Sequence, residues 1–100
     1  MIHEDERRTL ESFPEAKVIT AKKRCILGDH YHKIKTEKFI LLSGTAIIMF
    51  AGEDYVDYKW MEMGKVYDVN PGIKHAFDIF EGSILLGLCS HPYDPEDDIS

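Results

Sequence analysis

Two histidines on alternate residues, followed at short range by a glutamate, are the residues whose types and spacing could do chemistry. His30 and His32 stand in the run GDHYHKIKTEKFILLSG, and Glu37 follows after four residues. Side chains two residues apart in a β-strand face the same side, about 6–7 Å apart, so two imidazoles can converge on one metal ion. Glu37 would face the other side of one continuous strand. We therefore expect KIKT to turn, so that Glu37, with Phe39 and Leu41, faces the same cavity from a neighbouring antiparallel strand.

A fourth donor must come from a distant part of the chain. His75 is the candidate, because it follows the turn signal Asn-Pro-Gly at 70–72 by three residues. Neutral imidazoles with one carboxylate suit a divalent transition metal such as Zn, Ni, Mn or Fe, and leave positions open for water or substrate. A single histidine is more often structural than a ligand. His3 and His91 have no such neighbours, and we expect both to be solvated.

The composition is that of one globular domain. The chain has 100 residues, of which 44% are hydrophobic and 30% charged, which is within the range of ordinary globular proteins. The net charge of −6 argues against nucleic acid or an anionic membrane as a partner, since phosphate binding needs clustered Lys and Arg. The apolar run 46–51 is too short to span a bilayer. Cys25 and Cys89 form no pair motif and the N-terminus is charged, so we expect reduced cysteines and a cytoplasmic location.

Short β-rich runs alternate with turn signals along the chain. Spacings of about 8–12 residues between turns are typical of an all-β sandwich or barrel. The predicted strands are AKVITA, EKFILLS, TAIIMFA, YVDYKW, VYDV, HAFDIF and SILLGLC. Residues 4–12 could form at most one or two helical turns. We expect a single domain over 1–100, with a barrel over 13–90 and a surface tail over 91–100.

Alternation within these runs predicts which faces are buried. In YVDYKW, the apolar set Val56, Tyr58 and Trp60 shares one face, which we expect to face the core. The run SILLGLC is apolar on both faces, which is typical of a strand buried between sheets or at a dimer interface.

Two stretches of the sequence resemble the two sequence motifs of the cupins. The first cupin motif, G-x5-H-x-H-x3-4-E-x6-G, is matched by His30, His32, Glu37 and Gly44. The second, G-x5-P-x-G-x2-H-x3-N, is similar to GKVYDVNPGIKHAFDI, in which the aligned residues are Gly64, Gly72 and His75. Asn and Ile replace the motif's first Pro and its last Asn. The resemblance implies an all-β jelly-roll (double-stranded β-helix) barrel with a metal site at its mouth, held by His30, His32, Glu37 and His75.

A narrower resemblance implies a substrate class. HYHKIKTEKFILLSG resembles the HxHKTxxQFxxxxSG run of WxcM-like nucleotide-sugar ketoisomerases, and it also resembles the HYHxTKNEKFLVxxG run in the cupin half of capsular-polysaccharide reductase/epimerases. The end of the chain, LLGLCSHPYDPEDDI, is similar to their LLVLASxxYDxEDYI. This implies a sugar or nucleotide-sugar isomerase or epimerase, with an activated sugar as its small-molecule partner and a homodimer as its assembly.

Two forms of the chemistry stay open. With metal bound, the ion would polarise the sugar ketone as a Lewis acid, and Tyr67 would relay the proton. Without metal, His30 and His32 would form the acid–base pair. Glu37 favours metal, because the ketoisomerase run carries an amide there and a carboxylate in an apolar barrel needs a cation. The alternatives from other classes are an Fe(II)-dependent dioxygenase and a non-catalytic metal- or ligand-binding barrel.

Overall fold

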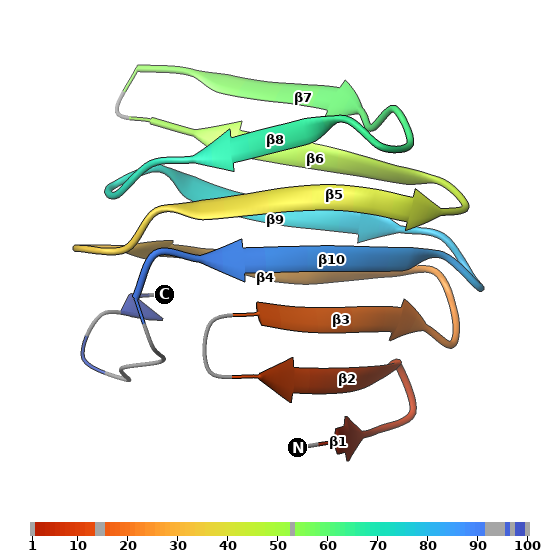
Figure 1. The fold of residues 1–100 in the computed structure, drawn as a ribbon. Helices are drawn as coiled ribbons and strands as arrows, with labels where there is room; N and C mark the ends of the chain where they lie inside the picture. Colours follow the sequence, from red (N-terminus) through yellow and green to blue (C-terminus); the bar gives the residue numbers. More distant parts are fainter. Residues whose placement is uncertain (1, 14–15, 53, 92–95, 97, 100) are drawn as a thin grey trace.

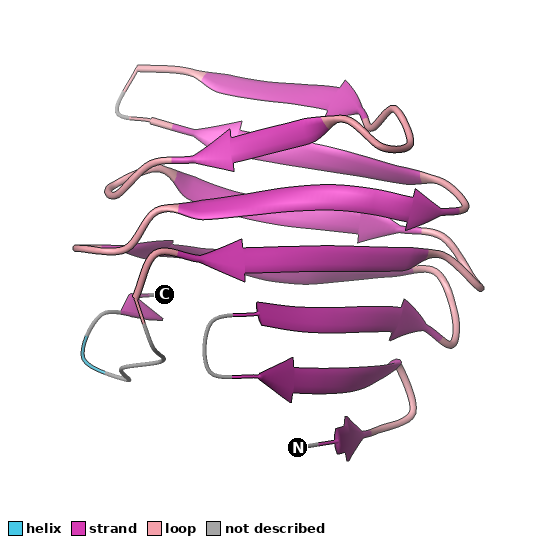
Figure 2. Ribbon diagram, viewed as in Figure 1, coloured by secondary structure: helices cyan, strands magenta, loops and turns pink. Residues whose placement is uncertain are grey.

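The computed structural model describes residues 2–13, 16–52, 54–91, 96 and 98–99, and over these residues it consists almost entirely of β-strands (Figure 2). Eleven strands are seen in this part of the chain. Their bounds are β1 (Ile2–Glu4), β2 (Arg8–Phe13), β3 (Ala16–Ala21), β4 (Cys25–His32), β5 (Glu37–Ser43), β6 (Ala46–Ala51), β7 (Val56–Trp60), β8 (Val66–Val69), β9 (Lys74–Ile79), β10 (Ile84–Cys89) and β11 (Asp98–Ile99). None of the described segments is a helix long and apolar enough to cross a membrane.

The strands form two antiparallel sheets that lie face to face (Figure 1). One sheet has the order β1-β2-β3-β10-β5-β8, and the other has the order β11-β4-β9-β6-β7. The chain crosses between the sheets at each step from β3 to β6, so strands adjacent in sequence face one another across the core. This is the predicted jelly-roll barrel, built as two packed sheets.

The core lies between the two sheets and is supplied by alternate residues of each strand. On β5, for example, Phe39 and Leu41 are buried whereas the intervening Ile40 is only partly covered. The buried apolar side chains are Ile19, Ala21, Leu27, Phe39, Leu41, Ala46, Ile48, Met61, Tyr67, Val69, Phe77, Ile79 and Leu85. Phe39 and Phe77 meet from opposite sheets with ring centroids 4.6 Å apart.

The seven strand runs expected from the sequence all appear, within one residue at each end. The helical turns considered for residues 4–12 do not: β1 and β2 form an antiparallel hairpin there, extending the six-stranded sheet. Within the segment expected to be a surface tail, β11 pairs with β4, while residues 92–95, 97 and 100 lie outside the described part of the chain.

The face assigned to β7 from alternation is wrong. Val56, Tyr58 and Trp60 are 75%, 70% and 62% exposed, so they point outward. The register shows why: Lys59, not Tyr58, is paired with Ile48, which is fully buried. β7 is an edge strand with a partner on one side only. All five residues of β7 are exposed, so neither face of this edge strand is covered, whereas alternation by itself predicts one buried face.

Candidate metal centre

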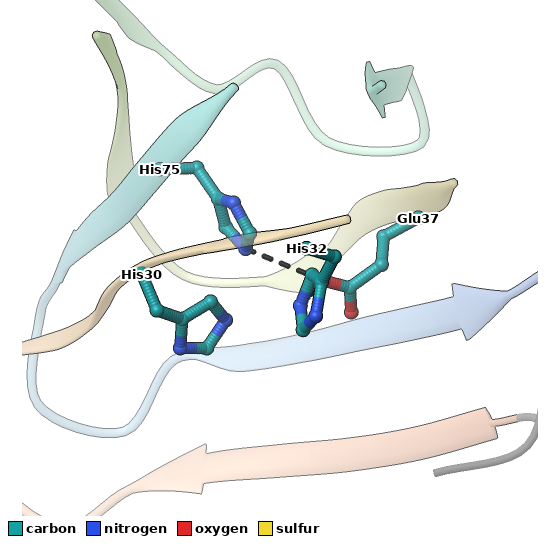
Figure 3. Close-up of side chains that lie close together, drawn as sticks. All are labelled: His30, His32, Glu37 and His75. Carbon is teal, nitrogen blue, oxygen red and sulfur yellow. Dashed lines mark ion pairs between the residues drawn. The ribbon is translucent and has the colours of Figure 1, made fainter. Parts of the chain in front are cut away.

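The four predicted metal ligands lie together at one end of the barrel, at the left in Figure 1. β4 ends there with His30 and His32, while β5 begins there with Glu37, and His75 is the second residue of β9, which also begins there. Figure 3 shows the four side chains converging from these three strands into one space. Antiparallel connectivity therefore brings residues up to 45 positions apart to one end of the barrel.

A β-bulge turns His30 and His32 inward. Leu27 on β4 is buried, and an unbroken strand would place residues 29 and 31 on the same inner face. Instead, Gly28 pairs with Ala76 while His30 pairs with His75, so β4 holds one extra residue between these pairs. The extra residue reverses the alternation. Gly28 allows this because its φ is +87° and a Cβ there would lie 3.1 Å from the His75 carbonyl oxygen.

Glu37 reaches the site from across the barrel. Its strand, β5, was expected beside the histidine strand, but it lies in the opposite sheet between β10 and β8. The KIKT segment thus crosses between sheets rather than making a hairpin. Burial of Glu37, Phe39 and Leu41 confirms their shared inward face.

The turn before His75 fixes the imidazole on β9. The backbone N–H of Gly72 donates to the carbonyl of His32 at 2.7 Å, which ties this turn to the end of β4. His75 Nδ1 lies 3.3 Å from the carbonyl oxygen of Ile73. A carbonyl only accepts, so Nδ1 carries the hydrogen and Nε2 is the atom available to a metal, an arrangement common among metal-binding histidines.

One donor atom from each of the four residues lies within 4.8 Å of the other three. Glu37 Oε1 is 2.6 Å from His32 Nε2 and 3.3 Å from His75 Nε2. Donors about 2.1 Å from a transition metal lie about 3.0–3.4 Å apart when adjacent and about 4.2 Å apart when opposite. Three nitrogens and one oxygen are donor types that suit a divalent transition metal. The contact between Glu37 and His32, at 2.6 Å, is closer than that of two ligands of one ion, so a bound metal would need these two side chains to move apart.

The electrostatics keep Glu37 in the form that a metal needs. Burial by itself raises the pKa of its carboxyl, but the His75 ring and the ammonium of Lys17 outweigh burial and hold that pKa below its ordinary range. Glu37 is fully buried yet ionised, so its negative charge faces the imidazoles in a medium of low dielectric constant. A cation placed among them is thereby favoured.

Two residues next to Glu37 were not assigned to the site from the sequence. Lys17 Nζ is 3.3 Å from Glu37 Oε2, and the Cys89 thiol contacts the same oxygen with Sγ at 3.6 Å. Burial and the charge of Glu37 raise the pKa of this thiol. Alternation in AKVITA contained the signal for Lys17, because it shares a face with the buried Ile19 and Ala21.

Tyr67 is buried, but its hydroxyl lies elsewhere. It accepts a hydrogen bond from the backbone N–H of Glu62 at 2.8 Å, in the loop at the other end of the barrel (Figure 1). Its role as a proton relay therefore stays a prediction.

Sequence comparison finds neither a matching family model nor a matching curated protein. Solved structures do match. CapF, the capsular polysaccharide assembling protein of Staphylococcus aureus, superposes with a TM-score of 0.86 and 23% identity over 98% of this chain, which spans 30% of the length of CapF. A double mutant of the 3,4-ketoisomerase QdtA from Thermoanaerobacterium thermosaccharolyticum, in complex with TDP, gives a TM-score of 0.78 and 26% identity over 99% of this chain and 81% of that one. The RmlC epimerase of Mycobacterium tuberculosis gives a TM-score of 0.72 and 16% identity over 84% of this chain and 48% of that one.

These three proteins are of the kinds that the two sequence resemblances implied: a sugar ketoisomerase, an epimerase and a capsular polysaccharide protein. The two-sheet topology agrees with that likeness. The chain therefore has the cupin jelly-roll fold, and it is structurally similar to cupin-like proteins that act on sugars.

Proposed function

We propose that this protein is a metal-dependent isomerase or epimerase whose substrate is a keto sugar, carried as a nucleotide sugar. The observation that supports the proposal most is the group of three imidazoles and one buried carboxylate with donors within 4.8 Å of one another. The structural likeness to a sugar 3,4-ketoisomerase and an epimerase supports the substrate class. A variant of that ketoisomerase was solved with TDP-4-keto-6-deoxyglucose.

His30, His32, Glu37 and His75 would hold the metal, which would be Zn, Ni, Mn or Fe. A metal there supplies a Lewis acid that polarises the sugar ketone and makes the neighbouring C–H acidic. His30 is the least buried of the four residues, so we expect the sugar to approach past its side of the group.

The remaining chemistry belongs to the protein. Glu37 and the imidazoles orient one another, and the ring of Phe39, with its centroid 5.7 Å from that of His75, gives the site an apolar floor that excludes water. Since the four donors would be engaged, the proton next to the ketone would pass to a group outside them. Tyr67 was predicted for this role, but its hydroxyl lies at the other end of the barrel, where it accepts from the backbone N–H of Glu62.

The metal-free alternative also has an observation in its favour. Glu37 Oε1 lies 2.6 Å from His32 Nε2, as when a carboxylate orients a catalytic imidazole. In this form His30 takes the proton and His32 returns it, or the reverse. Two further alternatives are an Fe(II) dioxygenase and a non-catalytic metal- or ligand-binding barrel. The experiment below distinguishes them from the metal-dependent and the metal-free isomerase. A cytoplasmic location and a homodimer remain part of the proposal.

The test combines metal analysis with proton exchange. The purified protein, loaded in turn with Zn²⁺, Ni²⁺, Mn²⁺ or Fe²⁺, is incubated with TDP-4-keto-6-deoxyglucose in D₂O, and the sugar is followed by NMR. We expect about one metal per chain, deuterium entering next to the ketone, and a new keto sugar or epimer. His32→Ala should lose metal and exchange together.

The exposed His91 provides the matched control, because His91→Ala removes an imidazole outside the group. Exchange that persists in protein stripped of metal would favour the acid–base pair. Oxygen consumption with Fe²⁺ would favour the dioxygenase. Bound metal without exchange or oxygen uptake on any keto sugar tried would favour a binding protein.

A further inference from the structure

Lys17 crosses the inner face of the six-stranded sheet to reach Glu37. It lies on β3, two strands away from β5, with β10 between them. Its Nζ is 3.3 Å from Glu37 Oε2, and its side chain is only 25% exposed. A lysine held this far inside a barrel is uncommon unless its charge is paired.

Gly87 makes room for that crossing. In the ladder of β10, Gly87 is paired with Lys17 on one side and with Phe39 on the other. A Cβ at Gly87 would lie 2.9 Å from Lys17 Cε, 3.1 Å from Lys17 Cγ and 3.0 Å from Phe39 Cε1. Gly87 is not among the glycines with positive φ, so space rather than backbone conformation explains a glycine here. The methylene groups of Lys17 occupy the space that a side chain at residue 87 would fill.

The two oxygens of Glu37 thereby have different neighbours. Oε2 is contacted by the ammonium of Lys17 at 3.3 Å and by the thiol of Cys89 at 3.6 Å. Oε1 faces the imidazoles, 2.6 Å from His32 and 3.3 Å from His75. Oε2 is therefore held by side chains of the six-stranded sheet, whereas Oε1 lies next to the imidazoles that would bind the metal.

We propose that Lys17 is a positioning residue that makes Glu37 a one-oxygen metal ligand and so keeps a coordination position open for substrate. The inference rests on the proposed metal site. A carboxylate can bind a metal through one or both oxygens, and a second bound oxygen takes a position that a substrate ketone would use. Lys17 prevents this because Oε2 already pairs with an ammonium.

The proposal predicts that removing Lys17 raises the metal affinity of the site instead of lowering it. The ammonium repels a nearby divalent cation, so removing it should tighten metal binding while altering the coordination. A lysine with a merely structural role would behave in the opposite way, since its loss would weaken the site. The two roles therefore differ in the direction of the change in metal affinity.

The experiment uses Co²⁺ as the metal and tropolone, a bidentate oxygen chelator, as the probe of open positions. Metal affinity is measured by competition with a chromophoric chelator, and coordination is measured by the visible Co²⁺ spectrum. For Lys17→Met we expect a shifted spectrum, Co²⁺ bound as tightly as in the wild type or several-fold tighter, and tropolone bound several-fold more weakly. Lys17→Arg, which keeps the charge, should restore tropolone binding at least in part.

Lys38→Met is the matched control. Lys38 also pairs with a carboxylate, that of Asp68 at 2.6 Å, but both side chains are about half exposed on the outer face. Its spectrum and affinities should equal those of the wild type. Gly87→Ala is the second variant, in case Lys17→Met folds poorly. The new Cβ displaces the lysine stem, so its Co²⁺ spectrum should shift in the same direction.

An unchanged spectrum and unchanged tropolone affinity in both Lys17→Met and Gly87→Ala would overturn the inference, and so would loss of Co²⁺ binding in folded Lys17→Met. In either case the proposed metal site would stand, because the wild type still binds Co²⁺. Failure of the wild type itself to bind Co²⁺ or any other metal tried would be a different result. It would remove the metal site, and this inference with it.

Discussion

His30 is paired with His75 across β4 and β9, one residue out of step with the pairing that runs from Cys25 to Gly28. The bulge is what brings the imidazoles onto the inner face, with ring centroids of this pair 4.7 Å apart. The candidate metal centre therefore depends on backbone geometry at Gly28 as much as on the four side chains themselves.

Gly28→Ala should damage the site through the backbone. At φ +87° an alanine pays a conformational penalty of about 1–2 kcal/mol, and its Cβ would press on the His75 carbonyl. We expect a loss of about that size in the free energy of unfolding, measured by urea denaturation, together with weaker metal binding. Gly64→Ala, at φ +80° but with open space around its Cβ, in the turn between β7 and β8 at the other end of the barrel, is the control. It should cost similar stability, and a similar loss of metal affinity there would contradict the role of the bulge.

The sequence predicts the fold well, because strands and turns depend on local patterns. β-rich runs and turn signals identify β3 and the strands from β5 to β10, while the spacing of the two histidines indicates β4 and the candidate site. Which strands pair within a sheet is harder to predict from the sequence. β5 lies opposite β4 rather than beside it, because KIKT, at 33–36, is a crossing segment whose length also suits a hairpin. Lys17 was missed because its partner Glu37 is two strands away in the sheet.

Glu37→Gln should change both metal binding and the pH dependence of stability. The carboxyl pKa in the folded protein is lowered from its ordinary value of 4.5. Ionised Glu37 therefore adds stability that is fully present above about pH 4.5 and is lost as the pH falls further toward the folded-state pKa. We expect the metal-stripped wild type to lose stability below pH 4.5 more steeply than Glu37→Gln, as measured by urea denaturation at several pH values. Identical pH profiles would contradict the lowered pKa.

The same substitution should weaken metal binding at pH 7, since a neutral amide replaces the only anionic donor of the four. Equilibrium dialysis with Zn²⁺ measures this directly. Glu62→Gln, which neutralises an exposed carboxylate at the other end of the barrel, should leave both the pH profile and the metal affinity unchanged.

Ser83→Ala should lower stability without touching the site. Ser83 Oγ accepts from the backbone N–H of Thr45 at 2.8 Å and donates to the carbonyl of the same residue at 3.0 Å, and Ser83 is 1% exposed. The Thr45 carbonyl keeps the backbone N–H of Phe80 as a donor, so only the Thr45 N–H loses its partner, and the loss of such a hydrogen bond costs about 0.5–1.5 kcal/mol. We expect that loss in thermal or urea unfolding, with Zn²⁺ affinity unchanged because Ser83 lies at the opposite end of the barrel. Reduced affinity in this variant would mean that global stability, rather than local geometry, controls metal binding.

Tyr58→Ser tests the outward face of β7. Tyr58 is 70% exposed, and substitution of an exposed residue changes the free energy of unfolding by no more than about 0.5 kcal/mol. Ile48→Ala, on the adjacent strand but fully buried, should cost about 2–5 kcal/mol, because it removes apolar contacts and leaves a cavity. Urea denaturation of the two variants side by side measures the contrast. A loss in Tyr58→Ser close to that in Ile48→Ala would show that this face is covered in solution, as by a second copy of the chain, since only a buried aromatic ring contributes on that scale.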